Sequence, residues 1–152
     1  MREINPAYAK EVCRIASECP YFQLQSMNLL ELDIGHSLLE IDLSEKHLQP
    51  FGVVHGGVFS TIIDAAAFWA VYPEVDENLG MTTVDLNLNY LAPATTGKLI
   101  AKGMCIKLGK TLGLGAAKVT DENGKMLAHG TSTLMVIPNF PFGPTDLPSK
   151  FL

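Results

Sequence analysis

One segment of this chain restricts its fold more than any other. It covers residues 49–72, with the sequence QPFGVVHGGVFSTIIDAAAFWAVY. After its first turn residues the segment is apolar on nearly every side, until Pro73. Glycine before such a run and proline after it are typical boundaries of a helix of about four turns. Because a helix that is apolar all round is a buried one, we expect a central helix around which the rest of the chain packs.

The few polar side chains of this helix carry the most information about function. Only Ser60, Thr61 and Asp64 interrupt its apolar surface, and their spacing places all three on one face. The helix is also shorter than the ~20 apolar residues that cross a membrane. An ionised carboxylate is costly to bury unless it is paired, hydrogen-bonded or used in chemistry. Asp64 is therefore a candidate functional residue, and a structural carboxylate bonded to the backbone is the alternative.

The composition indicates one globular domain over residues 1–152. A chain of 152 residues, 47% of them hydrophobic, can bury a full core without disulfides or metal. Its net charge of -5 argues against a general nucleic-acid binder, which usually presents a basic face. Three cysteines without CxxC spacing are typical of reduced thiols. With no signal peptide or membrane anchor recognisable, we expect a cytoplasmic protein without a membrane partner.

The remaining elements are predicted in chain order. Asn5 and Pro6 read as the N-cap and first residue of a surface helix over 5–18, which Pro20 stops before a short linker. The predicted strands cover 28–34, 37–43, 82–91, 98–108, 111–120 and 125–137. Residues 138–152, rich in Pro and Phe, are expected to be an extended tail docked on the surface. One buried helix with sequential hairpins predicts an α+β domain, its core about 28–137, with a long antiparallel sheet curled around the helix.

The strand over 82–91 shows the clearest alternation in the chain. Its apolar side chains, Val84, Leu86, Leu88 and Tyr90, fall on one face, and Asp85, Asn87 and Asn89 fall on the other. This pattern predicts a strand with one face against apolar surface.

Three stretches of the chain carry a family resemblance. They are FGVVHGGVFSTIIDAA, TTVDLNLNYLAPATTGKLIAKG and LGKTLGLGAAKVTDENGKMLAHGTSTLMV, and the resemblance around them covers roughly residues 30–137. In this order they resemble the hot-dog-fold acyl-CoA thioesterases of the PaaI-like type, which are related to 4-hydroxybenzoyl-CoA thioesterase. The resemblance implies a homodimer, usually paired into a tetramer, that hydrolyses acyl-CoA thioesters. It implies no metal and no cofactor apart from the coenzyme A of the substrate.

The resemblance also implies roles for individual residues. Gly56 falls where the family uses a backbone N–H at the helix start to polarise the thioester carbonyl, and Asp64 falls on the catalytic carboxylate. Gln49 falls where relatives carry Asn or Gln near the carbonyl or the attacking water. Thr83 matches a Ser or Thr that holds water in some members. Phe68 is a departure, because one aromatic-thioester branch has a hydroxyl residue there.

A second set of residues is expected to contact the substrate without taking part in the reaction. It comprises His55, Gly57, Phe68, Lys107, Lys110 and Thr111. Lysines in hairpins are most often solvated charges, but an acidic chain that binds the phosphates of coenzyme A needs a local cationic group. Lys107 and Lys110 are the first candidates, with Lys98 and Lys102 behind them. His55 is also expected to fix the loop before the helix.

The spacing of Gly56 and Asp64 makes a demand that needs no family resemblance. They are eight positions apart on one helix, which is about 12 Å along its axis. One carbonyl group cannot touch both residues of the same chain. If both serve one reaction, the second comes from another subunit, with two central helices antiparallel across a two-fold axis. We therefore predict an obligate dimer.

Two alternative functions remain open. A hot-dog dehydratase or hydratase would use His55 with the partner's Asp64, but the chain lacks that branch's proline-rich loop around the histidine. A non-catalytic acyl-CoA-binding domain is disfavoured because Asp64 is retained and no DNA-binding appendage is recognisable. Three other histidines, at positions 36, 47 and 129, show no ligand spacing, so no metal site is expected.

Overall fold

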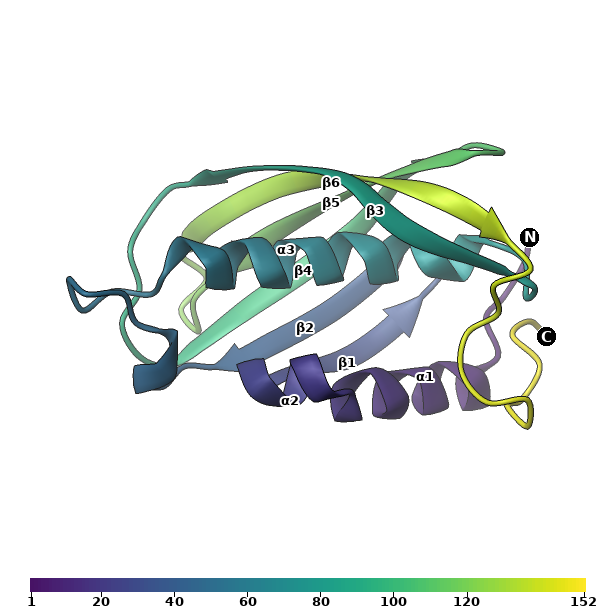
Figure 1. Cartoon of the computed structure of the whole chain (residues 1–152), viewed down its shortest axis with the longest axis horizontal. Helices are drawn as coiled ribbons and strands as arrows, with labels where there is room; N and C mark the ends of the chain where they lie inside the picture. Colours follow the sequence, from purple (N-terminus) through teal and green to yellow (C-terminus); the bar gives the residue numbers. More distant parts are fainter.

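The computed structural model describes residues 1–152 as a six-stranded antiparallel sheet that curves around one helix (Figure 1). In chain order its elements are α1 (Pro6–Glu18), α2 (Pro20–Gln25), β1 (Met27–Asp33), β2 (His36–Asp42), the 3-10 helix η1 (Glu45–His47), α3 (Gly56–Val71), the 3-10 helix η2 (Tyr72–Glu74), β3 (Leu79–Tyr90), β4 (Lys98–Leu108), β5 (Leu112–Thr120) and β6 (Met126–Pro138). The strand order is β1-β2-β4-β5-β6-β3. This arrangement confirms the predicted α+β class.

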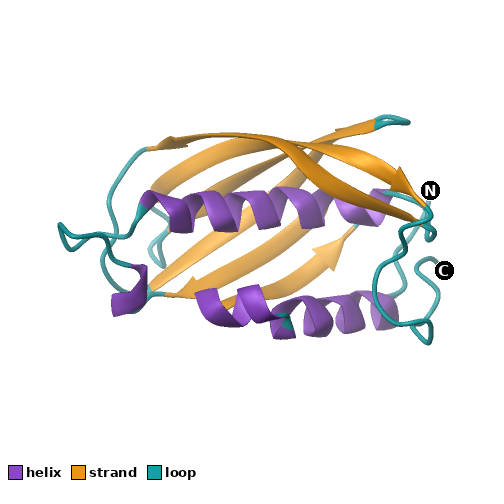
Figure 2. Ribbon diagram, viewed as in Figure 1, coloured by secondary structure: helices purple, strands orange, loops and turns teal.

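Helix α3 occupies the centre of the molecule, and Figure 2 shows the sheet curving around it. The helix begins at Gly56, after its N-cap His55, and ends at Val71, where the chain passes into η2. Nine of its 16 residues are buried, which confirms the predicted central helix. None of the helices combines the length and the apolar character needed to cross a membrane.

Small residues let the sheet approach the backbone of α3. A Cβ atom built on Gly103 of β4 would lie 2.1 Å from the carbonyl oxygen of Ala66, and one on Gly115 of β5 would lie 2.7 Å from that of Ala67. The hydroxyl of Ser37 on β2 also donates to the Ala66 carbonyl, at 2.7 Å. Three neighbouring strands therefore fix the position of α3 along the sheet.

The segment between α1 and β1 differs from the prediction. A linker was expected there, but Pro20–Gln25 forms the short helix α2. Pro20 lacks a backbone N–H, so it ends the preceding helix and also fits the first position of the next one. Ser26 follows in the left-handed conformation, with φ 52°, and turns the chain into β1. In Figure 1, α1 and α2 lie alongside β1.

The C-terminal tail is docked, as predicted. Its Phe142 packs against Trp69 and Tyr72 at the end of α3, and its Phe151 pairs with Ile4. Lys150 is only 1% exposed, and its Nζ donates to the carbonyl oxygens of Tyr72 at 2.8 Å and Val75 at 2.6 Å. Figure 1 shows the tail ending beside the N-terminus.

Strand β3 forms one edge of the sheet and departs from the simple alternation expected of it. Its pairing with β6 shifts between Thr83 and Asp85, so Val84 is an extra residue in a β-bulge, and it is 52% exposed. The bulge explains how Thr83 and Leu86, three residues apart, can both reach α3 from one strand. The predicted face that begins at Val84 is wrong for that residue.

Candidate active site

Asp64 lies on a half-buried stripe of α3, together with Ser60, Thr61 and Phe68. Thr83 Oγ1 on β3 donates a hydrogen bond to Asp64 Oδ1 at 2.8 Å. The second oxygen, Oδ2, has no hydrogen-bond partner in the chain. No backbone N–H donates to this carboxylate, whereas a purely structural carboxylate was expected to be bonded to the backbone. The arrangement leaves one oriented oxygen of Asp64 available to a water molecule or a substrate.

Ser132 is a contact of Asp64 that the sequence analysis missed. Its Oγ lies 3.5 Å from Asp64 Oδ1, the oxygen that Thr83 also contacts. Ser132 is completely buried on β6, between Gly130 and Leu134, which are buried on the same face. The sequence indicates only that Ser132 places a hydroxyl at an inward position of a strand. Its contact with Asp64 can be inferred only once β6 is known to lie against α3.

The N-terminus of α3 is the second part of the candidate site. His55 Nδ1 accepts a hydrogen bond from the backbone N–H of Gly57 at 2.8 Å. Gly57 was expected to contact the substrate, but its N–H is already used in the helix cap. The N–H of Gly56 has no acceptor in the chain and lies at the positive end of the helix dipole. A side chain at Gly56 would lie 3.1 Å from the ring of Tyr90. His55 thus acts as the N-cap of α3 through Nδ1, and its expected role in fixing the preceding loop stays a prediction.

Gln49 lies in the loop that precedes α3, within a turn closed by the bridge between Leu48 and Val54. Its side-chain oxygen Oε1 accepts a hydrogen bond from the backbone N–H of Phe51, and its backbone N–H donates to the Val53 carbonyl at 2.8 Å. The Nε2 group of Gln49 has no partner in the chain. Because α3 is continuous, Gly56 remains about 12 Å along the axis from Asp64. One chain therefore holds two half-sites, Gln49 with Gly56 and Asp64 with Thr83, and does not bring them together.

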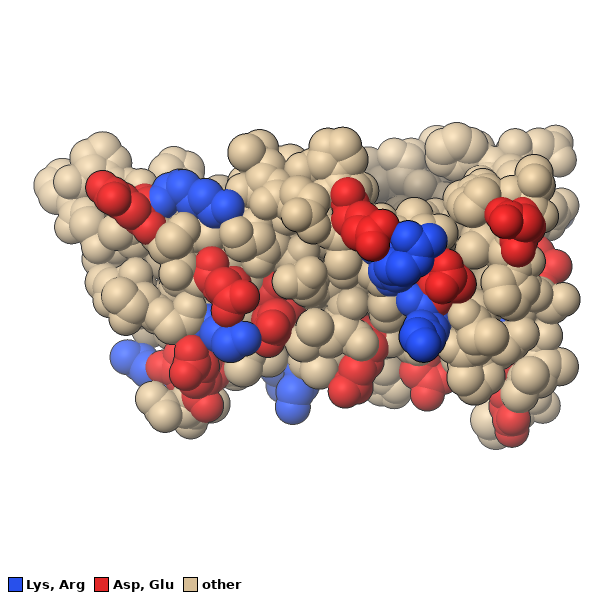
Figure 3. All heavy atoms as spheres, turned by 90° about the horizontal axis from the view of Figure 1, so that it is seen from below, with Lys and Arg blue, Asp and Glu red and all other residues tan.

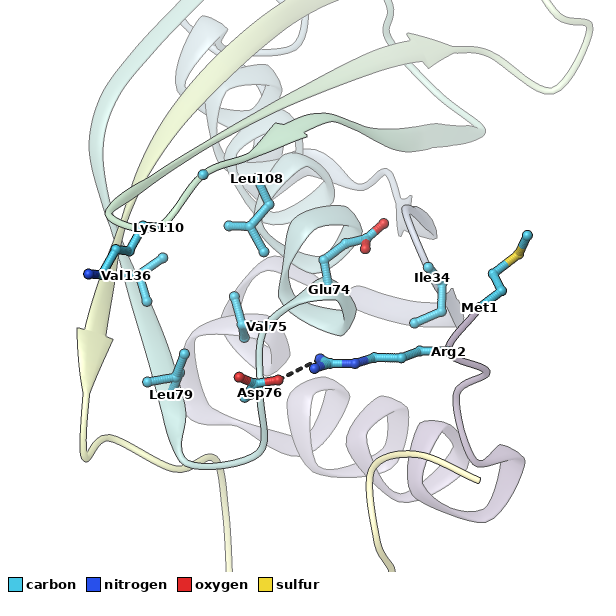
Figure 4. Close-up of a pocket in the computed structure, with 11 residues that line it drawn as sticks. Met1, Arg2, Ile34, Glu74, Val75, Asp76, Leu79, Leu108, Lys110 and Val136 are labelled. Atoms are coloured by element: carbon cyan, nitrogen blue, oxygen red, sulfur yellow. Dashed lines mark ion pairs between the residues drawn. The ribbon is translucent and has the colours of Figure 1, made fainter.

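The predicted coenzyme A contacts lie at the opposite end of α3 from Gly56. Lys107, Lys110 and Thr111 are exposed at the β4–β5 hairpin, which Figure 1 places at the end of the molecule that carries both termini. Lys110 borders a cavity of about 520 Å³. Figure 4 shows that Asp76, paired with Arg2, lies in the same cavity.

The charges around this cavity and on one face of the molecule are mixed. Glu74 and Asp76 offset the positive charges of Lys110 and Arg2, so the cavity by itself is a poor phosphate site. Figure 3 shows acidic and basic side chains interspersed on the face that carries α1 and α2. A polyanion would find no continuous basic surface on this face.

Cysteine and metal chemistry have no obvious centre in the structure. The three cysteines are free, and burial raises the pKa of the Cys13 thiol to about 11, which leaves it protonated and unreactive at neutral pH. No three His, Cys, Asp or Glu side chains lie close enough together to hold a metal ion.

A cavity of about 400 Å³ opens beside Asp64, and we call it the α2–α3 cavity. Its walls come from Tyr21 and Phe22 of α2, Phe68 and Trp69 of α3, and residues around them. Phe68 was expected to contact the substrate, and the structure places it in this wall. The α2 residues were not foreseen, because α2 itself was not.

Comparisons with known proteins identify relatives of this chain. The sequence profile of the thioesterase superfamily matches residues 51–128. Acyl-coenzyme A thioesterase 13 of Mus musculus is 27% identical over 128 residues, which cover 82% of this chain and 91% of that protein. The 1,4-dihydroxy-2-naphthoyl-CoA hydrolase of Listeria monocytogenes is 27% identical over 110 residues, which cover 72% of this chain and 89% of the relative.

A solved structure shows the same fold. A thioesterase from Haemophilus influenzae superposes with a TM-score of 0.80 at 20% identity, over 95% of this chain and 100% of that one. The long antiparallel sheet around a central helix is thus the predicted hot-dog fold. Because the matched profile covers just over half of the sequence, including Gly56 and Asp64, the chain belongs to the thioesterase superfamily.

Proposed function

We propose that this protein hydrolyses acyl-coenzyme A thioesters to the free acid and coenzyme A, at a site shared between two subunits. The observation that carries the proposal is the pair of half-sites on α3. Asp64 presents one free carboxylate oxygen, and Gly56, eight residues earlier, presents a free backbone N–H. Membership of the superfamily and the names of the two relatives support acyl-CoA as the substrate class.

Two features of the chain fit a partner that completes the site. The outer edge of β3 has no neighbouring strand, and the stripe of α3 beside it is only partly buried. If two α3 helices lie antiparallel with Ser60 near the two-fold axis, Gly56 of each chain lies opposite Asp64 of the other. The homodimer then contains two equivalent sites, each with both half-sites.

The proposed reaction follows from the groups in the shared site. The Gly56 N–H polarises the thioester carbonyl and stabilises the oxyanion, aided by the helix dipole. Asp64 of the partner acts as base on a water molecule, or attacks the carbonyl carbon itself, and Gln49 orients the water. The C–S bond breaks, coenzyme A leaves as the thiol after taking up a proton, and water supplies the oxygen of the acid. Thr83 holds Asp64 in place.

The antiparallel arrangement also gives the lysines a role. The C-terminal end of α3 lies near the β4–β5 hairpin of the same chain. In the antiparallel dimer this end comes close to the start of the partner's α3. Lys107 and Lys110, with Thr111 beside them, are therefore proposed to bind the phosphates of a coenzyme A whose thioester lies at the partner's Gly56. This position compensates for the overall acidic charge of the chain.

The outer face of the sheet offers a surface for a second dimer. Leu112 and Met135 are paired across β5 and β6, with exposed fractions of 51% and 40%, and Met104 on β4 is 50% exposed. Neighbouring Gly103 and Gly113 point at α3, so Met104 and Leu112 point to the outer face. We include a dimer of dimers through this apolar face in the proposal.

The decisive experiment is a thiol-release assay on a panel of acyl-CoA thioesters, run beside sedimentation at the same protein concentrations. We expect turnover by a dimer or tetramer. Turnover by a monomer would contradict the shared site. Binding of acyl-CoA without turnover would instead identify a non-catalytic acyl-CoA-binding domain.

A further inference from the structure

Tyr90, the last residue of β3, lies against the start of α3. A Cβ atom built on Gly56 would lie 3.1 Å from both Cζ and the hydroxyl oxygen of Tyr90, so only a residue without a side chain lets the ring come this close. The Cα–Cβ direction of a helical residue tilts towards the N-terminus of the helix, and the free N–H groups of the first turn point the same way. The Tyr90 hydroxyl therefore lies near the place that an acceptor of the Gly56 N–H would occupy.

The hydroxyl of Tyr90 differs from the other tyrosine hydroxyls of the chain. Tyr8 and Tyr72 are hydrogen-bonded to each other, with 2.8 Å between the oxygens. Tyr21 is hydrogen-bonded to Thr61, also at 2.8 Å. The Tyr90 hydroxyl has no partner in the chain, and the residue is 58% exposed. Its O–H is thus available as a donor to a ligand at the start of α3.

Two contacts hold the ring of Tyr90 in this position. Its backbone pairs with Ala128 of β6. Its ring meets the ring of Phe59 edge-on, with the centroids 6.1 Å apart. Phe59 is 3% exposed and lies on α3, three residues after Gly56. A donor on a ring that is already held in place needs little reorganisation when negative charge develops beside it.

We propose that Tyr90 is a further catalytic residue, whose hydroxyl donates a second hydrogen bond to the thioester oxygen polarised by the Gly56 N–H of the same chain. This inference rests on the proposed function for the reaction. Tyrosine hydroxyls and backbone N–H groups both serve as donors in oxyanion holes, and here one of each converges on the same end of α3. The proton stays on the phenol throughout, so the partner's Asp64 keeps its role as base or nucleophile. The alternative is that the ring only packs over the helix start.

A hydroxyl deletion distinguishes the donor from the packing residue. Tyr90→Phe keeps the ring over Gly56, so the fold should survive. Because the contact is stronger with the oxyanion than with the ground-state carbonyl, kcat and kcat/KM for acyl-CoA should fall together, on the order of 10²-fold, with little change in KM. Tyr8→Phe is the matched control, since it removes a buried tyrosine hydroxyl on α1 and should leave kcat unchanged. A wild-type kcat in Tyr90→Phe, or a raised KM alone, would contradict the assignment.

A spectroscopic measurement tests the contact without turnover. The probe is an acyl-CoA analogue in which a methylene group replaces the thioester sulfur, so that a ketone with an isotope-labelled carbonyl binds and is not hydrolysed. Hydrogen bonds to a carbonyl oxygen lower its stretching frequency, so the infrared band of the bound ketone should lie higher in Tyr90→Phe than in the wild type or Tyr8→Phe. Affinity for the ketone should fall roughly three- to tenfold in Tyr90→Phe. Affinity for an S-alkyl coenzyme A, which has no carbonyl, should not change.

The results distinguish a failure of this assignment from a failure of the proposed function. Hydrolysis by the wild type, with kcat and the carbonyl band both unchanged in Tyr90→Phe, would overturn the role of Tyr90 and leave the proposed function in place. A fall in kcat without a shift of the band would show that the ring serves only packing, which also overturns it. A band that shifts in Tyr90→Phe, in a protein that hydrolyses no acyl-CoA, would reject the proposed function and keep the contact.

Discussion

Thr83 on the edge strand β3 donates a hydrogen bond to Asp64 on the central helix, with 2.8 Å between the oxygens. This contact joins two residues that the family resemblance assigned separately, and it leaves Asp64 Oδ2 free. A β-bulge at the next residue of β3 lets the strand return to α3 at Leu86, which lines the α2–α3 cavity. The edge of the sheet thus positions the carboxylate and also lines the space beside it.

The first prediction concerns the charge of Asp64. Asp64→Asn keeps the shape of the side chain and removes its negative charge, so the fold should survive. If Asp64 is the base or nucleophile, kcat for acyl-CoA hydrolysis should fall by roughly 10²–10⁴, the range for a positioned acid–base group. Asp85→Asn is the control, because Asp85 is exposed on β3 and its carboxylate accepts a hydrogen bond from Asn87. An unchanged kcat in Asp64→Asn would show that Asp64 is neither the base nor the nucleophile.

The large elements could be predicted because their signals are local. The boundaries of α3 follow from glycine, proline and an all-round apolar surface, and those of β4 from a turn on each side. Helix α2 was missed because six residues are too few to show a helical period. The bulge at Val84 depends on pairing with β6, which no local pattern reports. Lys150 was left in a surface tail because a buried lysine is rare.

The residues of the candidate site also fall into two groups, those that a local sequence motif identifies and those that depend on tertiary packing. Gly56, Asp64 and Thr83 are at positions that a motif identifies, and the structure joins only the last two. Ser132 and Tyr21 reach the site from β6 and α2, so their contacts depend on the tertiary packing of elements far apart in the sequence. Whether the two half-sites meet depends on a second chain, which sequence spacing demanded but did not describe.

The second prediction concerns Ser132, which is expected to act through Asp64. Ser132→Ala removes a buried hydroxyl 3.5 Å from Asp64 Oδ1 and should lower kcat by about tenfold or less, with little change in KM. The sharper measurement is a double-mutant cycle. Once Asp64 is Asn, the further change Ser132→Ala should cost much less than it does in the wild type. Equal costs in both backgrounds would show that Ser132 serves only the packing of β6.

The third prediction tests the two hairpin lysines. Changing Lys107 and Lys110 together to Ala should raise KM for acyl-CoA with kcat nearly unchanged, because a contact to the nucleotide is equally strong in ground and transition states. The effect should shrink with a pantetheine thioester, which lacks the nucleotide. Lys118→Ala and Lys125→Ala are the controls, because Lys118 is exposed on β5 and Lys125 is exposed at the turn between β5 and β6. An equal loss on both substrates would contradict the assignment.

The fourth prediction concerns Lys150. Burial lowers the pKa of this lysine to about 7. Asp76 and Glu77 oppose this shift and Arg2 adds to it, while the ammonium lies 4.0 Å from the centroid of the Tyr72 ring. The unfolded chain therefore binds more protons than the folded one between pH 7 and 10.5. In that window the contribution of Lys150 to the free energy of unfolding should rise with pH, and below pH 7 it should be constant.

Lys150→Met keeps most of the volume of the side chain and cannot titrate. Denaturant unfolding of wild type and variant across this window should give a difference in the free energy of unfolding that grows with pH. Its total is a few kcal/mol at most, since one pKa unit corresponds to about 1.4 kcal/mol. Lys125→Met, at an exposed turn, is the control and should show no such growth. Parallel pH profiles for wild type and Lys150→Met would show that Lys150 does not titrate in this window.

The last prediction tests the shared site by mixing subunits. Gln49→Ala damages the half-site that contains Gly56, and Asp64→Asn damages the other, so each variant alone has two damaged sites per dimer. Gln49→Ala should cost less than Asp64→Asn, because the Gly56 N–H remains and water can partly replace the amide. In a heterodimer of the two variants, one site carries both lesions and the other carries none. Activity should therefore return to nearly half that of the wild type per heterodimer. If both half-sites of a reaction came from one chain, every site would keep one lesion and mixing would restore nothing.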